Sequence, residues 1–325
     1  MTSLSSVENC GVINSYVTAS SRFVAGLVGC ANESSTITDC YNTADVVGND
    51  YYVAGIVGQT DSNISGCYNT GLIDGSSGDY YMGGITGCAS SSSSVSDCYN
   101  TGTVKGGSEV GGIAGYAVSS KVIDCYNTGD IEGSGSYVGG LVGYAYSCPI
   151  TNCYNTGSVK SNSISVGGIV GRKYSNSPVI ACYSTGTIKG SSRVGGIVGH
   201  SDSSVSIIAC YNTGSVTGDN DCVGGVVGRT YNTTITACYN LGTVSGASDY
   251  GGVMGFAYDD VTDCYYYPYY SSYNSYATYS ETLETKMKGT EIITTLNDAA
   301  GSTYFEQDTN SVNDSYPILV GIDYE

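Results

Sequence analysis

The chain of 325 residues has no tryptophan, a single histidine, four prolines and three phenylalanines. Charged residues make up only 12% of it, about half of the ~25% usual in globular proteins. The 29 acidic residues outnumber the 11 basic ones and give a net charge of −18. Because phosphate recognition needs clustered lysine and arginine, we expect no nucleic-acid partner. One histidine and no C-x-x-C pair offer no tetrahedral ligand set, so we predict no metal and no cofactor.

Long apolar runs are also missing. No stretch approaches the ~18 consecutive apolar residues of a membrane span, so direct membrane insertion is not expected. No basic-then-apolar signal peptide follows Met1. The chain is therefore expected to be either a mature or excised region of a larger protein, or cytoplasmic.

Three residue types are abundant instead: 47 glycines, 32 tyrosines and 14 cysteines. Ten of the cysteines recur at intervals of 26 to 31 residues, nine of them are followed by tyrosine, and in seven cases asparagine comes next. These anchor cysteines are Cys10, Cys40, Cys67, Cys98, Cys125, Cys153, Cys182, Cys210, Cys238 and Cys264. The sequence is thus a tandem array of one short unit.

A second anchor, of the form V-G-G-I-V-G, recurs in step with the cysteines. Its copies are Val24–Gly29, Val53–Gly58, Met82–Gly87, Val110–Gly115, Val138–Gly143, Val166–Gly171, Val194–Gly199, Val223–Gly228 and Tyr250–Gly255. Each unit is rich in Gly, Ser, Thr, Val, Ile and Tyr, which suits short strands and turns rather than helix. A period near 28 residues is too short for a propeller blade or a two-helix repeat.

We therefore predict an all-β protein, a parallel β-solenoid (β-helix) of nine to ten coils. Each coil should hold three strands of about five residues and three corners, stacked at ~4.8 Å. Parallel crossovers are nearly always right-handed, so the coil is expected to be right-handed. Glycines should stand at the corners, where positive φ is needed, and where packed layers approach closely.

Side chains alternate across a strand, so the offset from each anchor cysteine separates interior from surface. The cysteine, the residue two places on and the aliphatic residue six places on should face inward. We expect a ladder of interior thiols, mostly reduced, with some disulfides as the alternative. The ladder comprises Cys40, Cys67, Cys98, Cys125, Cys153, Cys182, Cys210 and Cys238. Cys30, Cys88, Cys148 and Cys222 lie off it, and their state stays open.

The residues one and three places after each cysteine should then face outward, as a tyrosine column beside a threonine column. These columns are Tyr41, Tyr68, Tyr99, Tyr126, Tyr154, Tyr183, Tyr211 and Tyr239, with Thr70, Thr101, Thr128 and Thr156. Stacked rings can simply stabilise neighbouring rungs. An aromatic column with polar tips can also bind a host glycan, a protein ligand or another copy of the chain.

The phrase V-G-G-[IL]-V-G, a polar loop and then C-Y-N-T-G resembles the GLUG motif over roughly 6–265. Departures are Ala44 for glycine, Leu241 for threonine and Ser184 for asparagine. That repeat occurs in bacterial surface adhesins and beside the peptidase region of some IgA-cleaving metalloproteases. The resemblance implies a secreted or wall-displayed bacterial protein. It brings no peptidase, since H-E-x-x-H is absent.

The predicted function is a non-enzymatic scaffold, with no catalytic residues, that acts in adhesion or self-assembly through the tyrosine and threonine columns. The alternative is a carbohydrate-binding or polysaccharide-processing β-helix protein, which would need carboxylates clustered in a groove. The single histidine, His200, is interpreted as a variable loop residue. The local basic residues, Arg172, Lys173, Lys189, Arg193 and Arg229, are interpreted as turn decoration.

The repeat ends near Cys264, so we divide the chain into repeats at 1–265 and a Tyr-rich connector with a C-terminal cap at 266–325. Glu281 after Ser280 predicts one helix, and Thr290 to Gly301 outlines a second that stops at the glycine. A strand is expected through Tyr316–Val320. The motifs Thr282–Lys288, Thr290–Asn297 and Tyr316–Leu319 also resemble the close of GLUG arrays. The cap should cover the last coil edge, whereas the N-terminal solenoid end could self-associate.

Overall fold

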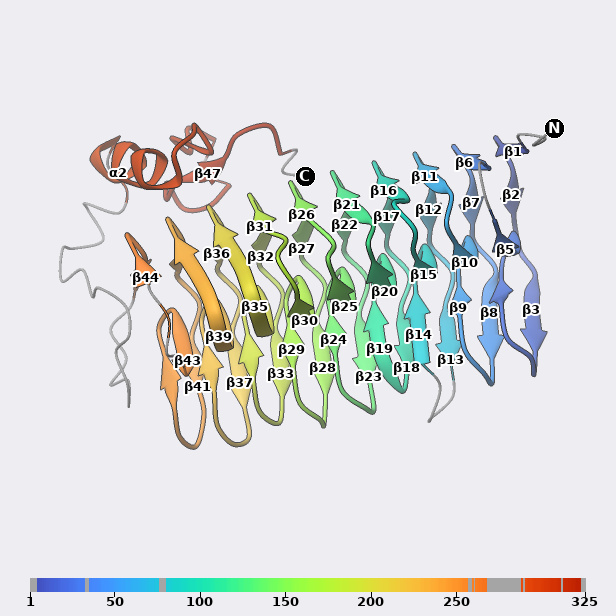
Figure 1. Cartoon of the computed structure of the whole chain (residues 1–325), viewed down its shortest axis with the longest axis horizontal. Helices are drawn as coiled ribbons and strands as arrows, with labels where there is room; N and C mark the ends of the chain where they lie inside the picture. The colour runs from blue at the N-terminus through green and yellow to red at the C-terminus, as the bar shows by residue number, and fades with distance from the viewer. Residues whose placement is uncertain are drawn as a thin grey trace.

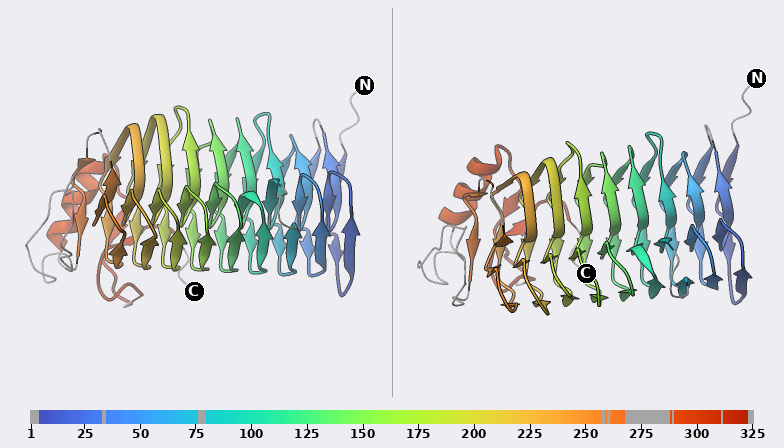
Figure 2. Two further views of the ribbon diagram at one scale, coloured as in Figure 1. Left: turned by 90° about the horizontal axis from the view of Figure 1, so that it is seen from below. Right: turned by 60° about the horizontal axis from the view of Figure 1, so that its bottom comes forward.

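The computed structural model describes residues 5–32, 35–75, 80–256, 259, 261–267, 288, 290–310 and 312–322. The chain winds into a parallel β-solenoid, and its coils stack side by side along one rod (Figures 1 and 2). Equivalent strands of successive coils pair in parallel, in columns of nine or ten strands. This confirms the predicted fold class.

Each coil contains five short strands rather than the three that were predicted. The first column consists of β5 (Val28–Ala31), β10 (Val57–Thr60), β15 (Thr86–Ala89), β20 (Ala114–Val118), β25 (Val142–Tyr146), β30 (Val170–Tyr174), β35 (Val198–Ile208), β39 (Val227–Thr236) and β43 (Met254–Phe256). The second consists of β1 (Ser6–Glu8), β6 (Thr36–Thr38), β11 (Asn63–Ser65), β16 (Ser94–Ser96), β21 (Lys121–Ile123), β26 (Ile150–Thr151), β31 (Val179–Ile180) and β44 (Val261–Thr262). The long strands β35 and β39 belong to both columns.

The third column contains the residues that follow the anchor cysteines. It consists of β2 (Gly11–Val12), β7 (Tyr41–Asn42), β12 (Tyr68–Asn69), β17 (Tyr99–Asn100), β22 (Tyr126–Asn127), β27 (Tyr154–Asn155), β32 (Tyr183–Ser184), β36 (Tyr211–Asn212), β40 (Tyr239–Asn240) and β45 (Tyr265–Tyr266).

Two further columns complete the coil. The fourth consists of β3 (Tyr16–Ala19), β8 (Asp45–Gly48), β13 (Ile73–Gly75), β18 (Val104–Gly106), β23 (Ile131–Gly133), β28 (Val159–Ser161), β33 (Ile188–Gly190), β37 (Val216–Gly218) and β41 (Val244–Ser245). The fifth consists of β4 (Val24–Ala25), β9 (Val53–Ala54), β14 (Tyr80–Gly83), β19 (Ser108–Gly111), β24 (Val138–Gly139), β29 (Val166–Gly167), β34 (Val194–Gly195), β38 (Val223–Gly224) and β42 (Tyr250–Gly251).

The interior follows the predicted parity. The anchor cysteines from Cys40 to Cys264 are buried, and with the aliphatic residues of the glycine motif they form one apolar core. Valines and isoleucines of the fourth and fifth columns form a second core, which includes Val104, Val138 and Ile188. The core is therefore a set of stacked rungs.

The corners are made by residues other than glycine, and here the expectation was wrong. The residue before the anchor cysteine is left-handed in every described coil, for example Asp97 (φ 53°) and Ala209 (φ 53°), and only Gly66 (φ 62°) is a glycine. A second left-handed residue precedes each glycine motif, for example Tyr137 (φ 65°). Asparagine and aspartate tolerate this conformation better than other L-residues. The resulting bend brings the buried valine or isoleucine and the cysteine three places on to the same side.

The repeated glycines are required by close approach instead. A Cβ added to Gly112 would lie 2.4 Å from the carbonyl oxygen of Gly140 and 2.5 Å from Cγ of Asn127. The glycine at this position packs against the next coil and an interior asparagine in most motifs, whereas Gly168 meets Ser184 and Gly252 meets the Tyr266 ring. The expectation that glycines stand where packed layers approach closely is confirmed.

The C-terminal region folds back beside the rod. Helix α2 (Thr290–Ala300) ends at Gly301 (φ 72°), as predicted, and an antiparallel pair follows, β46 (Phe305–Glu306) and β47 (Ile318–Leu319). The helix expected after Ser280 and the motif at Thr282–Lys288 lie outside the described residues, apart from Lys288. In Figure 1 this region lies along the upper side of the last coils, and the chain then runs back toward β26.

Candidate functional site

The tyrosines of the third column form one continuous stack of rings. From Tyr41 to Tyr239 successive ring centroids are 4.8 to 5.3 Å apart, and adjacent ring planes differ by at most 10°. We call this column the tyrosine stripe. Because each ring face lies on its neighbour, the stripe presents ring edges and phenol groups outward. The threonines beside it, Thr70, Thr101, Thr128 and Thr156, are exposed.

The stripe has two parts that differ in burial. Tyr41, Tyr68, Tyr99 and Tyr126 are half-buried and form the open stripe. Tyr183, Tyr211 and Tyr239 are at most 4% exposed and form the covered stripe. Tyr154 lies at the boundary, partly buried against the covering residues.

The chain's own C-terminal region buries the covered stripe. Ile292 and Leu296 of α2, Phe305 of β46, and Tyr316 and Leu319 share one apolar cluster with Tyr183, Tyr211 and Tyr239. The contact is therefore lateral, on the side of the last coils, whereas the sequence led us to expect a cap across the coil edge. The tyrosines predicted to face solvent along the whole rod do so only in its N-terminal part.

The contact also uses the phenol group. The Tyr239 hydroxyl donates to the backbone carbonyl of Pro317, and it accepts a hydrogen bond of 2.9 Å from Nδ2 of Asn313. The ring of Phe305 lies 5.9 Å from that of Tyr239. The stripe thus binds a polypeptide through apolar contact at its ring edges and hydrogen bonds at its tips.

The residue that precedes each anchor cysteine distinguishes the two parts. It is alanine beside the covered stripe, at Ala181, Ala209 and Ala237, and all three belong to the apolar cluster. Beside the open stripe it is Asp39, Gly66, Asp97 or Asp124, and the three aspartates are exposed. At the boundary, before Cys153 and Tyr154, it is Asn152. Sequence reasoning did not consider this position. The change from Asp or Asn to Ala was the available signal.

An asparagine ladder lies directly behind the stripe. Asn100 donates 2.7 Å to Oδ1 of Asn127 and 2.7 Å to the carbonyl of Gly102, and the pattern repeats at Asn42, Asn69, Asn127 and Asn212. Ser184 interrupts it, and Oδ1 of Asn212, on the next coil, is buried without a partner. These bonds fix the depth and register of each tyrosine.

All fourteen cysteines are free thiols. The eight thiols of the interior ladder are buried, and each donates to the carbonyl two residues earlier, as Cys98 does to Ser96 at 3.0 Å. They are Cys40, Cys67, Cys98, Cys125, Cys153, Cys182, Cys210 and Cys238. Burial raises the pKa of Cys98 well above its usual value. Cys30 and Cys88 both align with Gln59, which separates them.

A second surface feature lies at the junction of the fifth and first columns, and sequence reasoning missed it. It combines the left-handed residue before each glycine motif with the residue after it, and we call it the seam. Ring pairs include Phe23–Tyr52 at 5.1 Å, Tyr52–Tyr81 at 5.0 Å and Tyr116–Tyr144 at 5.3 Å. In the last coils the residues after the motif are Arg172, His200, Arg229 and Phe256.

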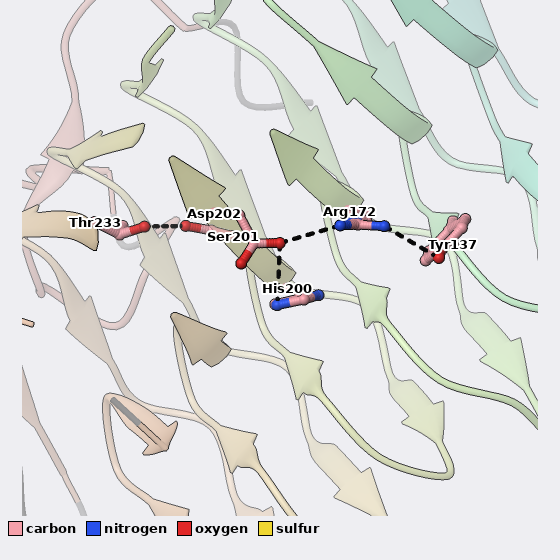
Figure 3. A network of polar contacts seen from close by, with 6 residues as sticks. All are labelled: Tyr137, Arg172, His200, Ser201, Asp202 and Thr233. Atoms are coloured by element: carbon pink, nitrogen blue, oxygen red, sulfur yellow. Dashed lines mark hydrogen bonds and ion pairs between the residues drawn. The ribbon is translucent and has the colours of Figure 1, made fainter. Parts of the chain in front are cut away.

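Figure 3 shows the polar network of the seam. Asp202 accepts from Nη2 of Arg172 at 3.2 Å and lies 3.3 Å from Nε2 of His200, and Arg172 Nη1 donates 3.2 Å to the Tyr137 hydroxyl. Burial, aided by the surrounding arginines, lowers the pKa of His200 to about 4 against the opposing effect of Asp202. His200 is 7% exposed and lies within β35, so its interpretation as a loop residue was wrong.

The basic residues read as turn decoration are mostly in strands. Lys173 in β30 is fully buried, and its Nζ donates 2.5 Å to the carbonyl of Cys148 and also to the Ser177 hydroxyl. Burial lowers the pKa of Lys173 to about 8. Lys189 and Arg229 lie in β33 and β39, and only Arg193 stands at a corner.

Fold and surface together define a tandem-repeat parallel β-solenoid with a lateral aromatic stripe that is half covered by the chain itself. Four segments of it, at residues 78–105, 106–132, 134–160 and 219–245, match the GLUG motif. The chain therefore contains GLUG repeats, as its sequence indicated. No curated protein matches it.

A crystal structure of a candidate immunoglobulin A1 protease from Bacteroides ovatus is similar to 97% of this chain and 75% of that one, with 17% sequence identity and a TM-score of 0.44. The expectation that the chain is not an enzyme is overturned by this finding, because the similar protein is named as a protease. We withdraw it; a likeness of this degree assigns no activity to the chain. Within the described residues, no helix has the length and apolar character needed to cross a membrane.

Proposed function

We propose that the chain is a surface scaffold whose open stripe binds a protein partner in adhesion outside the cell. The observation that carries this proposal is the covered stripe, where the same tyrosine position already binds a polypeptide through apolar side chains and a backbone carbonyl. The GLUG repeats support a secreted or surface location.

Three features of the open stripe define the chemistry of the partner. The rings of Tyr68, Tyr99 and Tyr126 offer edges for apolar side chains. Asp97 and Asp124 flank them with exposed carboxylates, which favour a partner with basic residues. The last described residues of the covering segment, Gly321 and Ile322, line a hollow beside the open stripe. Its other lining residues are Asp97, Asp124, Tyr126, Asn152 and Tyr154. The open stripe therefore continues an existing polypeptide contact.

The ring geometry favours a protein over a glycan. Sugars stack on exposed aromatic faces, but the faces of Tyr99 and Tyr126 lie against each other at 4.9 Å with planes 2° apart. Ring edges at regular spacing suit the side chains and carbonyls of a peptide, as Tyr239 demonstrates within the chain.

The test uses beads coated with the full chain and two arrays, one of immobilised extracellular proteins and one of glycans. We expect adhesion to proteins, which the Tyr68→Ser/Tyr99→Ser/Tyr126→Ser variant should lose by at least tenfold. A Thr185→Ala variant, on an exposed threonine beside the covered stripe, is the matched control. Circular dichroism establishes that the triple variant keeps its β structure. Unchanged protein adhesion by a folded triple variant, or adhesion to glycans alone, contradicts the proposal.

A further inference from the structure

Glu109 interrupts the aromatic column of the seam. The left-handed residue before the glycine motif is Phe23, Tyr52 and Tyr81 in three coils, Glu109 in the next, and Tyr137 in the one after. Backbone hydrogen bonds keep these residues in register, as from Val110 N to the Tyr137 carbonyl at 3.2 Å. A carboxylate thus occupies the place of a ring, between coils that carry one.

Tyrosines surround this carboxylate. Added Cβ atoms at Gly115 and Gly143 would lie 2.6 Å from the carbonyl oxygen and carbonyl carbon of Glu109, respectively. The residues that follow these glycines, Tyr116 and Tyr144, therefore flank Glu109 from the neighbouring column. Their ring centroids are 5.3 Å apart, and Tyr81 lies 5.3 Å from Tyr116.

The carboxylate of Glu109 lacks compensation. Its Oε2 is buried without a hydrogen-bond partner, and no ion pair to it occurs in the described part of the chain. Burial raises its pKa to about 7. The titratable groups around it are Tyr81, Tyr116, Tyr144 and Cys88. These groups are neutral at pH 7 at their ordinary pKa, and burial raises the pKa of each further. Glu109 as a whole is half-buried, but a buried carboxylate oxygen without a partner requires an explanation.

The same seam shows which group would satisfy it. Two coils further along, Cζ of Arg172 lies 5.4, 5.5 and 5.7 Å from the ring centres of Tyr137, Tyr144 and Tyr174, and its guanidinium pairs with Asp202. Stacked tyrosines and a carboxylate thus hold a guanidinium there. Around Glu109 the tyrosines and the carboxylate are present, and the described residues supply no cation.

We propose that Glu109, with Tyr81, Tyr116 and Tyr144, is a receptor site for an arginine side chain of a partner protein. A guanidinium stacks on tyrosine and donates in a planar fork to a carboxylate, which a lysine ammonium does not. The site is built from other strands than the tyrosine stripe. It therefore does not depend on the proposed function, and either can fail alone.

The test measures binding of blocked Gly-Arg-Gly peptide to the full chain by NMR of labelled tyrosine rings and glutamate carboxyls. We expect binding at pH 8 that Glu109→Gln weakens at least tenfold, with blocked Gly-Lys-Gly weaker than the arginine peptide. The peptide should also lower the pKa of Glu109 from about 7. The control, Glu132→Gln, removes an exposed carboxylate paired with Lys105 and should leave binding unchanged.

The affinity for the arginine peptide should depend on pH through the ionisation of the Glu109 carboxyl group. Below pH 7 Glu109 is protonated and loses its charge, so affinity should fall about tenfold per pH unit between pH 6 and pH 5. Equal binding to Glu109→Gln, no binding of any peptide, or an unchanged Glu109 pKa overturns the proposal. Methylguanidinium that binds as tightly as the peptide also overturns it, because the site would then take a free small cation.

Discussion

The covered and the open stripe are the same repeat position in two environments. Tyr211 and Tyr126 follow an interior cysteine, stack on neighbours at about 4.9 Å and stand before an interior asparagine. They differ in what lies beside them, Ala209 in one case and Asp124 in the other, and in the presence of α2 and β46 above. The repeat therefore builds the column, and the residue before the cysteine distinguishes the part on which a segment packs from the part on which none of the described residues does.

The difference has a clear energetic basis. Burying an aspartate against Leu296 or Phe305 would leave a carboxylate without water or partners, which is unfavourable by several kcal/mol. Alanine in the left-handed conformation carries roughly 1 kcal/mol of backbone strain relative to glycine. Three alanines that accept this strain at Ala181, Ala209 and Ala237 indicate that the apolar contact outweighs it.

The largest effect is expected from Leu296→Ala in α2. Leu296 is fully buried in the cluster, so its truncation should destabilise the docked segment by about 3 kcal/mol. Hydrogen exchange should accelerate at amides of 290–322 and leave the coils that carry Tyr68 and Tyr99 unchanged. Thr294→Ala, on the exposed face of the same helix, is the control. Equal acceleration in the N-terminal coils would show that the docked segment stabilises the whole rod.

The second largest effect is expected from exchanging the residue before the anchor cysteine between the covered and the open stripe. Ala209→Asp places a carboxylate in the apolar cluster and should destabilise docking by about 2 kcal/mol. Asp97→Ala puts alanine into the left-handed conformation at φ 53°, so it should leave docking unchanged and destabilise the rod by about 1 kcal/mol at most. Protease sensitivity between α2 and β47 reports on docking. If Ala209→Asp is cleaved no faster than the parent chain, the alanines are not what permits the contact.

The sequence was sufficient to predict the regular interior positions of the repeat. It was not sufficient to predict the backbone conformation at the corners or the contacts between coils. Cys98, Asn100 and Val104 recur at fixed offsets, so alternation alone placed them in the interior. The corners were mispredicted because Asp97, Tyr137 and Ala209 adopt positive φ, which composition assigns to glycine. The glycines are needed for contact between coils, a distance that only the stacked structure reveals.

The surface features were harder to predict from the sequence because they depend on positions that vary between coils. The seam joins residues on both sides of the glycine motif, and no single offset shows that Glu109 lies beside Tyr116 and Tyr144. Docking of the C-terminal region on the stripe joins distant segments, as Tyr239 contacts Phe305 and Pro317, 66 and 78 residues further along, with only the three alanines as a local sign. His200 was misread because a lone polar residue in a variable segment is typical of a loop.

The smallest effect is expected from a variant of the asparagine ladder that lies behind the covered and the open stripe. Ser184→Asn should restore the missing donor to Oδ1 of Asn212, which is buried without a partner, as Asn127 donates 2.8 Å to Asn155 in the open part. One regained buried hydrogen bond predicts stabilisation by about 1 kcal/mol, read as a higher midpoint in urea.

The matched variant Ser184→Asp fills the same volume and cannot donate, so it should not stabilise. The Tyr183 ring lies on the strand that carries Ser184, between Tyr154 and Tyr211 at 5.0 Å from each. A continuous ladder should therefore also reduce exchange of the backbone amides of Tyr183 and Tyr211. If Ser184→Asn and Ser184→Asp shift the urea midpoint equally, the hydrogen bond to Asn212 is not the cause of the shift.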